Sequence, residues 1–104
     1  MGVAWSPVYP ATLRTADGVR LDAAHTPNGS LELGIVVAHG FTGSWRERPT
    51  RRITQLLSRF GGVVSFDFRG HGRSSGQTTV GDREILDLDV AVKHARAIGY
   101  RRVA

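Results

Sequence analysis

Polar and apolar positions alternate along residues 12–15 and again along residues 19–22. Alternation with a period of two is typical of a strand that has one face on the core and the other in solvent. Asp17-Gly18 lies between the two segments, and such a pair favours the positive φ angles of a tight turn. The pattern predicts a β-hairpin at a sheet edge, followed by a second turn at residues 27–30.

A continuous apolar run, Ile35-Val36-Val37-Ala38, follows that turn and leads into a glycine-containing segment. A short run rich in β-branched residues predicts a strand that is buried on both faces. Residues 63–68 have the same character, and residues 49–60 lie between the two strands. Strand, helix and strand in this order form a βαβ unit with a parallel pair. The helix is expected to bury the apolar stripe formed by Ile53, Leu56, Leu57 and Phe60.

A second helix is predicted over residues 82–98, with its buried stripe at Ile85, Leu88, Val92 and Ala95. Acidic side chains come early in this segment and basic ones late, which complements the helix dipole. Gly99 is suited to ending the helix. Residues 102–104 resemble the start of a further parallel strand, so the fold class is α/β.

The composition fits one small domain of 104 residues. The absence of cysteine excludes disulfides, thiolate catalysis and cysteine-based zinc sites. The net charge is +5, and all the basic residues except Lys93 are arginines. A local group at Arg46, Arg48, Arg51 and Arg52 makes nucleic-acid binding a minor alternative to a solvated helix face, and we expect no nucleic-acid partner.

No apolar segment has the length of a membrane span, and the N-terminus lacks the basic start and long apolar region of a signal peptide. We therefore expect a cytoplasmic location and no membrane partner. The sequence shows no ligand cluster for a metal. Gly70, Gly72 and Gly76 match a dinucleotide-binding loop weakly, but they neither open a helix directly nor follow the first strand of the sheet, so no metal and no cofactor is expected. His25 and His94 are expected at the surface, and Asp67 and Arg69 are expected to pair with each other.

The segment His39-Gly40-Phe41-Thr42-Gly43 is the strongest candidate site. It directly follows the buried strand at residues 33–38 and precedes a helix. Backbone N–H groups in such a loop have no partner in the sheet, so they are free to bind an anion. We expect the chemistry of the chain at the carboxyl end of this strand.

Gly72-Arg73-Ser74-Ser75-Gly76 matches the G-x-S-x-G pattern of a nucleophile elbow. An elbow needs its serine directly between a buried strand and the start of a helix. Here residues 69–72 follow the strand, and the next helix begins only near Asp82. We therefore reject Ser74 as a nucleophile and expect a loop serine that bonds nearby backbone.

The segment from His39 to Ser44, together with Asp67-Phe68-Arg69-Gly70-His71-Gly72-Arg73-Ser74-Ser75-Gly76, resembles the α/β-hydrolase family. The resemblance covers residues 11–104 and is nearest to the esterase, lysophospholipase and serine-aminopeptidase-like branches. It implies the N-terminal part of the α/β-hydrolase fold, in which an antiparallel β-hairpin precedes βαβα and the start of a further parallel strand. The result would be an incomplete three-layer sandwich with strands in the order first, second, fourth, third, fifth.

The family's chemistry is nucleophilic acyl transfer by a serine, with two backbone N–H groups that hold the oxyanion. By resemblance, Phe41 supplies one of these N–H groups, and His39 and Gly40 shape the loop. Thr42 and His71 would contact a small-molecule acyl substrate. The catalytic base of the family lies near its C-terminus, so His39 is not expected to be the base.

The elbow, the acid and the base of the family should follow the strand that starts near Arg102. Residues 1–104 are thus expected to be a single partial domain without the catalytic triad: an N-terminal fragment of a serine hydrolase for ester, thioester or amide bonds, inactive alone. The strand at residues 33–38 would become an open edge, so the isolated chain is expected to fold poorly, aggregate or require a partner. The alternative is a non-catalytic interaction module that pairs this edge with a partner chain or a second copy.

Overall fold

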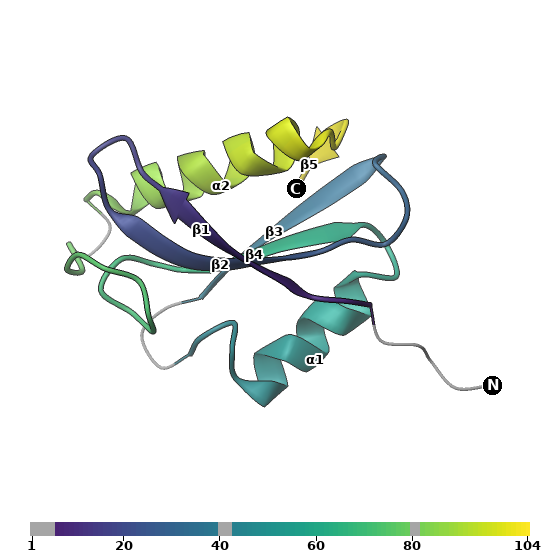
Figure 1. Cartoon of the computed structure of the whole chain (residues 1–104), viewed down its shortest axis with the longest axis horizontal. Coiled ribbons are helices and arrows are strands. Elements are labelled where there is room, and N and C mark those ends of the chain that lie inside the picture. Colours follow the sequence, from purple (N-terminus) through teal and green to yellow (C-terminus); the bar gives the residue numbers. More distant parts are fainter. Residues whose placement is uncertain (1–5, 40–42, 80–81) are drawn as a thin grey trace.

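The computed structural model describes residues 6–39, 43–79 and 82–104. These residues form one mixed sheet with a helix on each face (Figure 1). In chain order the elements are β1 (Tyr9–Arg14), β2 (Arg20–Thr26), β3 (Leu33–His39), α1 (Arg48–Leu57), β4 (Gly62–Asp67), α2 (Glu84–Ile98) and β5 (Arg102–Val103). The strands lie in the order β1-β2-β4-β3-β5, which confirms the expected order and fold class.

The β-hairpin has the predicted turn. β1 pairs antiparallel with β2, so that Leu13 lies opposite Leu21, and both side chains are buried. Gly18 has a φ of 85° in the turn, a conformation that glycine adopts without strain. β2 then pairs antiparallel with β4, and β4 pairs parallel with β3, as expected for a βαβ unit.

Two apolar clusters form the core on the α2 side of the sheet. The first consists of buried Leu13, Leu21, Ala23, Phe66 and Ala91, and the second of buried Val64, Ala95 and Tyr100. Small alanines on α2 let this helix lie close to the sheet. Val36 of β3 packs against both clusters, so the core joins β3 to β4.

β3 is less buried than predicted. Its central residues Ile35, Val36, Val37 and Ala38 are half-buried instead of buried on both faces. The residues of β5 lie opposite Leu33 and Gly34, and the hydrogen bond farthest along β3 runs from the Val36 N–H to the Ala104 carbonyl. Among the residues that the structure describes, the carboxyl half of β3 therefore has β4 as its one neighbouring strand.

The buried stripe predicted for residues 49–60 is wrong for three of its four members, which are exposed, whereas Leu57 is half-buried. Ile53 is 51% exposed, Leu56 55% and Phe60 74%. The buried positions are Thr54 and Ser58, and the Thr54 hydroxyl lies 3.4 Å from the Ser65 hydroxyl of β4. The contact between α1 and the sheet is thus partly polar.

On α2 the predicted stripe is wrong in its first half. Ile85 and Leu88 are exposed, whereas Asp87, Ala91 and Ala95 are buried. The buried face of α2 is therefore rotated toward its small residues and one carboxylate. Among the residues with described positions, no helix is both long and apolar enough to cross a lipid bilayer.

Candidate functional site

The carboxyl end of β4 carries a fully buried carboxylate, Asp67. Its Oδ2 accepts a hydrogen bond of 2.6 Å from the Ser44 hydroxyl, and its Oδ1 accepts one of 2.8 Å from the Trp45 backbone N–H. Burial raises the pKa of the Asp67 carboxyl, and these two hydrogen bonds partly offset that rise. Asp67 thus ties the chain that follows β3 to the end of β4.

Phe68, the residue after Asp67, binds the end of β3 where that segment begins. The Phe68 backbone N–H donates a hydrogen bond of 2.8 Å to the His39 carbonyl. Gly40, Phe41 and Thr42, which the sequence singled out, lie outside the described residues. The described residues on both sides of them, His39 and Ser44, are therefore anchored by the consecutive residues Asp67 and Phe68.

His39 ends β3 and lies opposite Asp67 in the parallel register. Burial lowers the pKa of its imidazole, and the negative charges of Asp67 and Glu47 offset part of that change. The neutral form of the ring is therefore favoured more than in a solvent-exposed histidine. Within the described part of the chain, its buried Nε2 atom has no hydrogen-bond partner.

Gly72 lies against the Asp67 carboxylate. A Cβ atom at Gly72 would stand 2.3 Å from Asp67 Oδ2, and the residue has a φ of 52°. Only glycine fits this position without displacing the carboxylate. The loop after β4 therefore lies against the Asp67 carboxylate, which accepts the hydrogen bond from Ser44.

Ser74 lies in the loop between β4 and α2, as predicted, and not at a strand-to-helix elbow. Its hydroxyl donates a hydrogen bond of 2.7 Å to the Asp67 carbonyl and accepts one of 2.9 Å from the Asp22 N–H. Both partners are backbone groups, so Ser74 joins the loop to β2 and β4.

The predicted pairing of Asp67 with Arg69 is wrong. The Arg69 guanidinium instead binds Asp87 through Nη2 at 2.7 Å and Asp17 through Nη1 at 2.8 Å. The Arg69 backbone N–H also donates to Asp87 Oδ2 at 2.9 Å. Hydrogen bonds from Arg69 and Thr15 hold the pKa of Asp17 well below its usual range. This triad joins the hairpin turn, the β4–α2 loop and α2.

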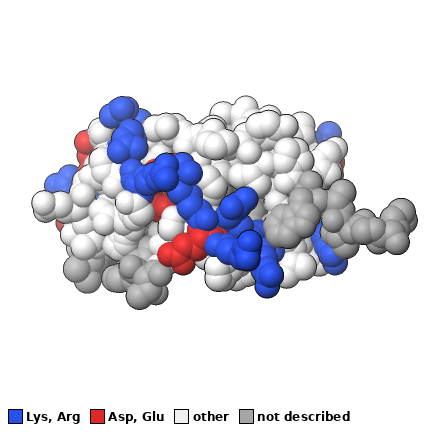
Figure 2. Space-filling model, turned by 60° about the horizontal axis from the view of Figure 1, so that its bottom comes forward, with Lys and Arg blue, Asp and Glu red and all other residues white. Residues whose placement is uncertain are grey.

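A second ion pair lies next to Trp45. The Arg46 guanidinium donates to both carboxylate oxygens of Asp22, at 2.6 and 3.0 Å, and lies 4.5 Å from the centre of the Trp45 ring. Charge alone could not reveal this bond, because Asp22 and Arg46 are far apart in sequence. Figure 2 shows basic and acidic side chains next to each other on the face that it brings forward. At least one arginine of the local group is therefore neutralised.

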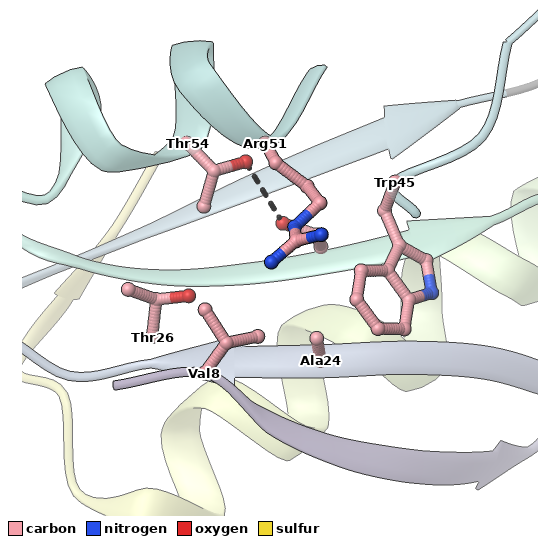
Figure 3. A pocket seen from close by; sticks show the side chains of 7 residues that line it. Val8, Ala24, Thr26, Trp45, Arg51 and Thr54 are labelled. Atoms are coloured by element: carbon pink, nitrogen blue, oxygen red, sulfur yellow. Dashed lines mark hydrogen bonds between the residues drawn. The ribbon is translucent and has the colours of Figure 1, made fainter. Parts of the chain in front are cut away.

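A small hollow lies between α1 and the sheet (Figure 3). Its lining residues are Val8, Ala24, Thr26, Trp45, Arg51, Thr54 and Ser65. Its volume of about 10 Å³ corresponds to roughly one water molecule, which is too small for a substrate. A wider hollow of about 240 Å³ adjoins it at Val8, Pro10, Trp45, Arg46 and Arg51. Neither hollow is lined by His39 or His71, so neither coincides with the site predicted from the sequence.

His71 is half-buried in the loop after β4, and its backbone N–H donates a hydrogen bond of 3.0 Å to the Phe68 carbonyl. Its contact with a substrate remains a prediction. His25, expected at the surface, is half-buried, and its Nε2 lies 2.6 Å from the Tyr100 hydroxyl. Across the described residues, no group of three or more His, Cys, Asp or Glu is arranged to hold a metal ion.

Comparison with known proteins identifies relatives by structure. No family model matches the sequence, and no curated protein matches it. The esterase Pf2001 from Pyrococcus furiosus is 36% identical with a TM-score of 0.79, and the match covers 94% of this chain and 40% of that one. An α/β serine hydrolase from Xanthomonas campestris is 26% identical, with a TM-score of 0.73 and coverage of 93% and 48%.

An α/β serine hydrolase homologue from Coxiella burnetii matches with a TM-score of 0.73 at 20% identity, over 99% of this chain and 51% of its own. The chain is therefore related to the α/β-hydrolases and has the N-terminal part of their fold. It spans about half or less of the length of these three proteins.

Proposed function

We propose that this chain supplies the oxyanion-binding part of a serine hydrolase that cleaves an ester, thioester or amide by acyl transfer. The observation that carries the proposal is the 36% identity to an esterase over nearly the whole chain. The anchoring of His39 and Ser44 at the carboxyl ends of β3 and β4 supports it. This edge of a parallel sheet is where open α/β folds bind their ligands.

In this proposal the backbone N–H of Phe41 donates to the oxyanion that forms when the carbonyl of the substrate is attacked. His39 and Gly40 shape the loop that presents this N–H, and Thr42 and His71 contact the substrate. The serine nucleophile, its base and the orienting acid would come from polypeptide equivalent to the rest of the relatives. The chemical contribution of this chain is then electrostatic, since a fixed N–H dipole stabilises charge that develops only in the transition state.

A hybrid enzyme tests this proposal. The chain would replace the matching 40% of the Pyrococcus esterase, and hydrolysis of a p-nitrophenyl ester would be measured. We expect the hybrid to be active, and Phe41→Pro, which removes the backbone N–H, to lower kcat by about 100-fold or more. Phe41→Ala keeps that N–H and is the matched control, with a kcat close to that of the parent hybrid.

Equal kcat values for Phe41→Pro and Phe41→Ala would refute the role of Phe41. Thermal melting of both variants decides whether a loss of activity reflects unfolding. A hybrid that melts cooperatively but does not hydrolyse the ester would refute the proposed function itself.

A further inference from the structure

We propose that Asp67 is a positioning residue for acyl transfer, one that holds the Ser44–Trp45 turn so that the preceding loop presents its N–H group to the substrate. This inference rests on the proposed function, but its geometry belongs to described residues alone. Asp67 does not touch the substrate in this account. It acts through Ser44 and Trp45, which follow the oxyanion-binding loop in the chain.

The first argument is the way in which the carboxylate is satisfied. Among the described residues, no basic side chain forms an ion pair with Asp67, although it is fully buried. The Asp67 carboxylate accepts hydrogen bonds from the Ser44 hydroxyl and from the Trp45 backbone N–H, both on the segment after β3. A buried carboxylate without these donors would lose its stabilisation, so the turn and the charge hold each other in place.

The second argument is the direction of the Ser44 hydroxyl. Ser44 Oγ accepts a hydrogen bond of 3.2 Å from the Arg46 N–H, which leaves its own proton to be donated to Asp67. One side chain therefore fixes a hydroxyl and a backbone N–H at the same time. An asparagine at position 67 could still accept a hydrogen bond from the Trp45 N–H. An alanine at position 67 could accept neither from this N–H nor from the Ser44 hydroxyl.

The third argument is enclosure. A Cβ atom at Gly72 would stand 2.3 Å from Asp67 Oδ2 and 3.3 Å from Ser44 Oγ, so the β4–α2 loop lies against the hydrogen bond that joins these two oxygen atoms, and the bond from Ser74 to the Asp67 carbonyl holds the loop there. The full burial of Asp67 leaves no solvent at its carboxylate to replace the bonds to the turn. Displacement of a catalytic group by about 1 Å can reduce a rate about 100-fold, so this tie is sufficient to matter for catalysis.

The catalytic test uses the hybrid esterase with Asp67→Ala and Asp67→Asn. We expect Asp67→Ala to lower kcat by about 100-fold with KM changed by less than about twofold, because an oxyanion donor acts in the transition state. Asp67→Asn should recover most of the lost kcat. Asp87→Asn changes a buried carboxylate that contacts neither Ser44 nor Trp45, and at temperatures below its melting point it should leave kcat unchanged.

The structural test uses hydrogen exchange in the hybrid esterase, because the isolated chain is expected to fold poorly. Asp67→Ala should speed amide exchange in residues 43–46 by about tenfold or more while β3 and β4 keep their protection, and Asp67→Asn, which keeps the bond from the Trp45 N–H, should exchange at a rate between those of the parent and Asp67→Ala. If Asp67→Ala does not fold, Ser44→Ala removes one of the two ties and should give the same changes at smaller size.

The outcomes separate the two proposals. An unchanged kcat in folded Asp67→Ala, or a rise in KM alone, would overturn the positioning role. If the parent hybrid melts cooperatively but is inactive, the proposed function fails, and the exchange experiment still decides whether Asp67 holds the turn. Equal exchange in Asp67→Ala and the parent would overturn the inference on its own.

Discussion

Tyr100 lies so close to Gly62 that a Cβ atom there would stand 1.7 Å from the Tyr100 hydroxyl oxygen. The same ring covers Gly34, where a Cβ atom would stand 2.8 Å from a ring carbon. Gly34 and Gly62 are register partners on β3 and β4, so one ring lies across the parallel pair at its amino end. These glycines are needed for packing, since neither has a positive φ.

Gly62→Ala is therefore expected to lower the free energy of unfolding by about 3 kcal/mol, because Tyr100 must move. In the Tyr100→Ala background the ring is absent, and the same change should be nearly neutral. Urea unfolding of the two single variants and the double variant in the hybrid esterase gives the coupling energy, which should lie at about 2–3 kcal/mol. Additive effects would show that the ring and the glycine are independent.

Removal of the Asp87 carboxylate should be among the most destabilising single changes. Asp87→Ala leaves Arg69, whose side chain is only 3% exposed, without its most buried partner, at an expected loss of about 3–5 kcal/mol. Asp17→Ala should cost less, because Asp17 is partly solvated and water can replace it. Chemical unfolding of both variants checks this order, and an equal loss from the two would contradict it.

Acidification should weaken the fold through His25. Burial lowers the pKa of His25 below its ordinary 6.5, and the nearby positive charge of His94 adds to this effect. The unfolded chain therefore binds more protons than the folded one, so stability is fully present above pH 6.5 and is lost as the pH falls through and below that value.

Burial also lowers the pKa of His39, so protonation of His39 likewise weakens the fold as the pH falls. The pKa of Asp67 is raised, so protonation of Asp67 above pH 3.8 stabilises the folded state relative to the unfolded one. Urea unfolding at pH 7.5 and pH 5.5 should therefore show a smaller loss of stability on acidification in His25→Gln than in the parent. A parent stability that rises toward pH 5.5 would contradict the sign derived for the two histidines.

Ser74 should not react as a nucleophile despite its motif. Its proton is donated to the Asp67 carbonyl, and its oxygen accepts a backbone N–H. A fluorophosphonate probe, which labels activated serines, should leave Ser74 unmodified in the full chain, with mass spectrometry as the measurement. Labelling of Ser74 that is lost in Ser74→Ala would contradict this account.

Local patterns were sufficient to predict the strands and helices in their order along the chain. Asp17-Gly18 marked the hairpin, and the apolar runs marked β3 and β4, because turn chemistry and side-chain period act over a few residues. The strand order came from the resemblance of the two loop motifs to a known family. The sheet order and the relatives confirm it.

The buried faces of the helices could not be predicted in the same way. The period of Ile53, Leu56 and Phe60 shows that α1 has an apolar stripe, but not which surface the stripe meets. The sheet instead contacts the side of α1 that carries Thr54, through Ser65. Periodicity describes one helix, whereas burial depends on two surfaces.

The partners of charged residues were also beyond local patterns. Asp67 and Arg69 are neighbours in sequence, yet each binds groups brought close by the fold, and Arg69 reaches Asp17 across 52 positions. Ser44 and Trp45 as partners of Asp67 follow only from the positions of β3 and β4 in the sheet.

The central claim is that Phe41 donates its backbone N–H to an oxyanion. The most direct measurement is a crystal structure of the hybrid esterase with a phosphonate on its serine, since the phosphonyl oxygen occupies the place of the oxyanion. We expect the Phe41 nitrogen about 2.7–3.1 Å from that oxygen. An oxygen bound by other donors, with the Phe41 nitrogen more than about 4 Å away, would contradict the claim.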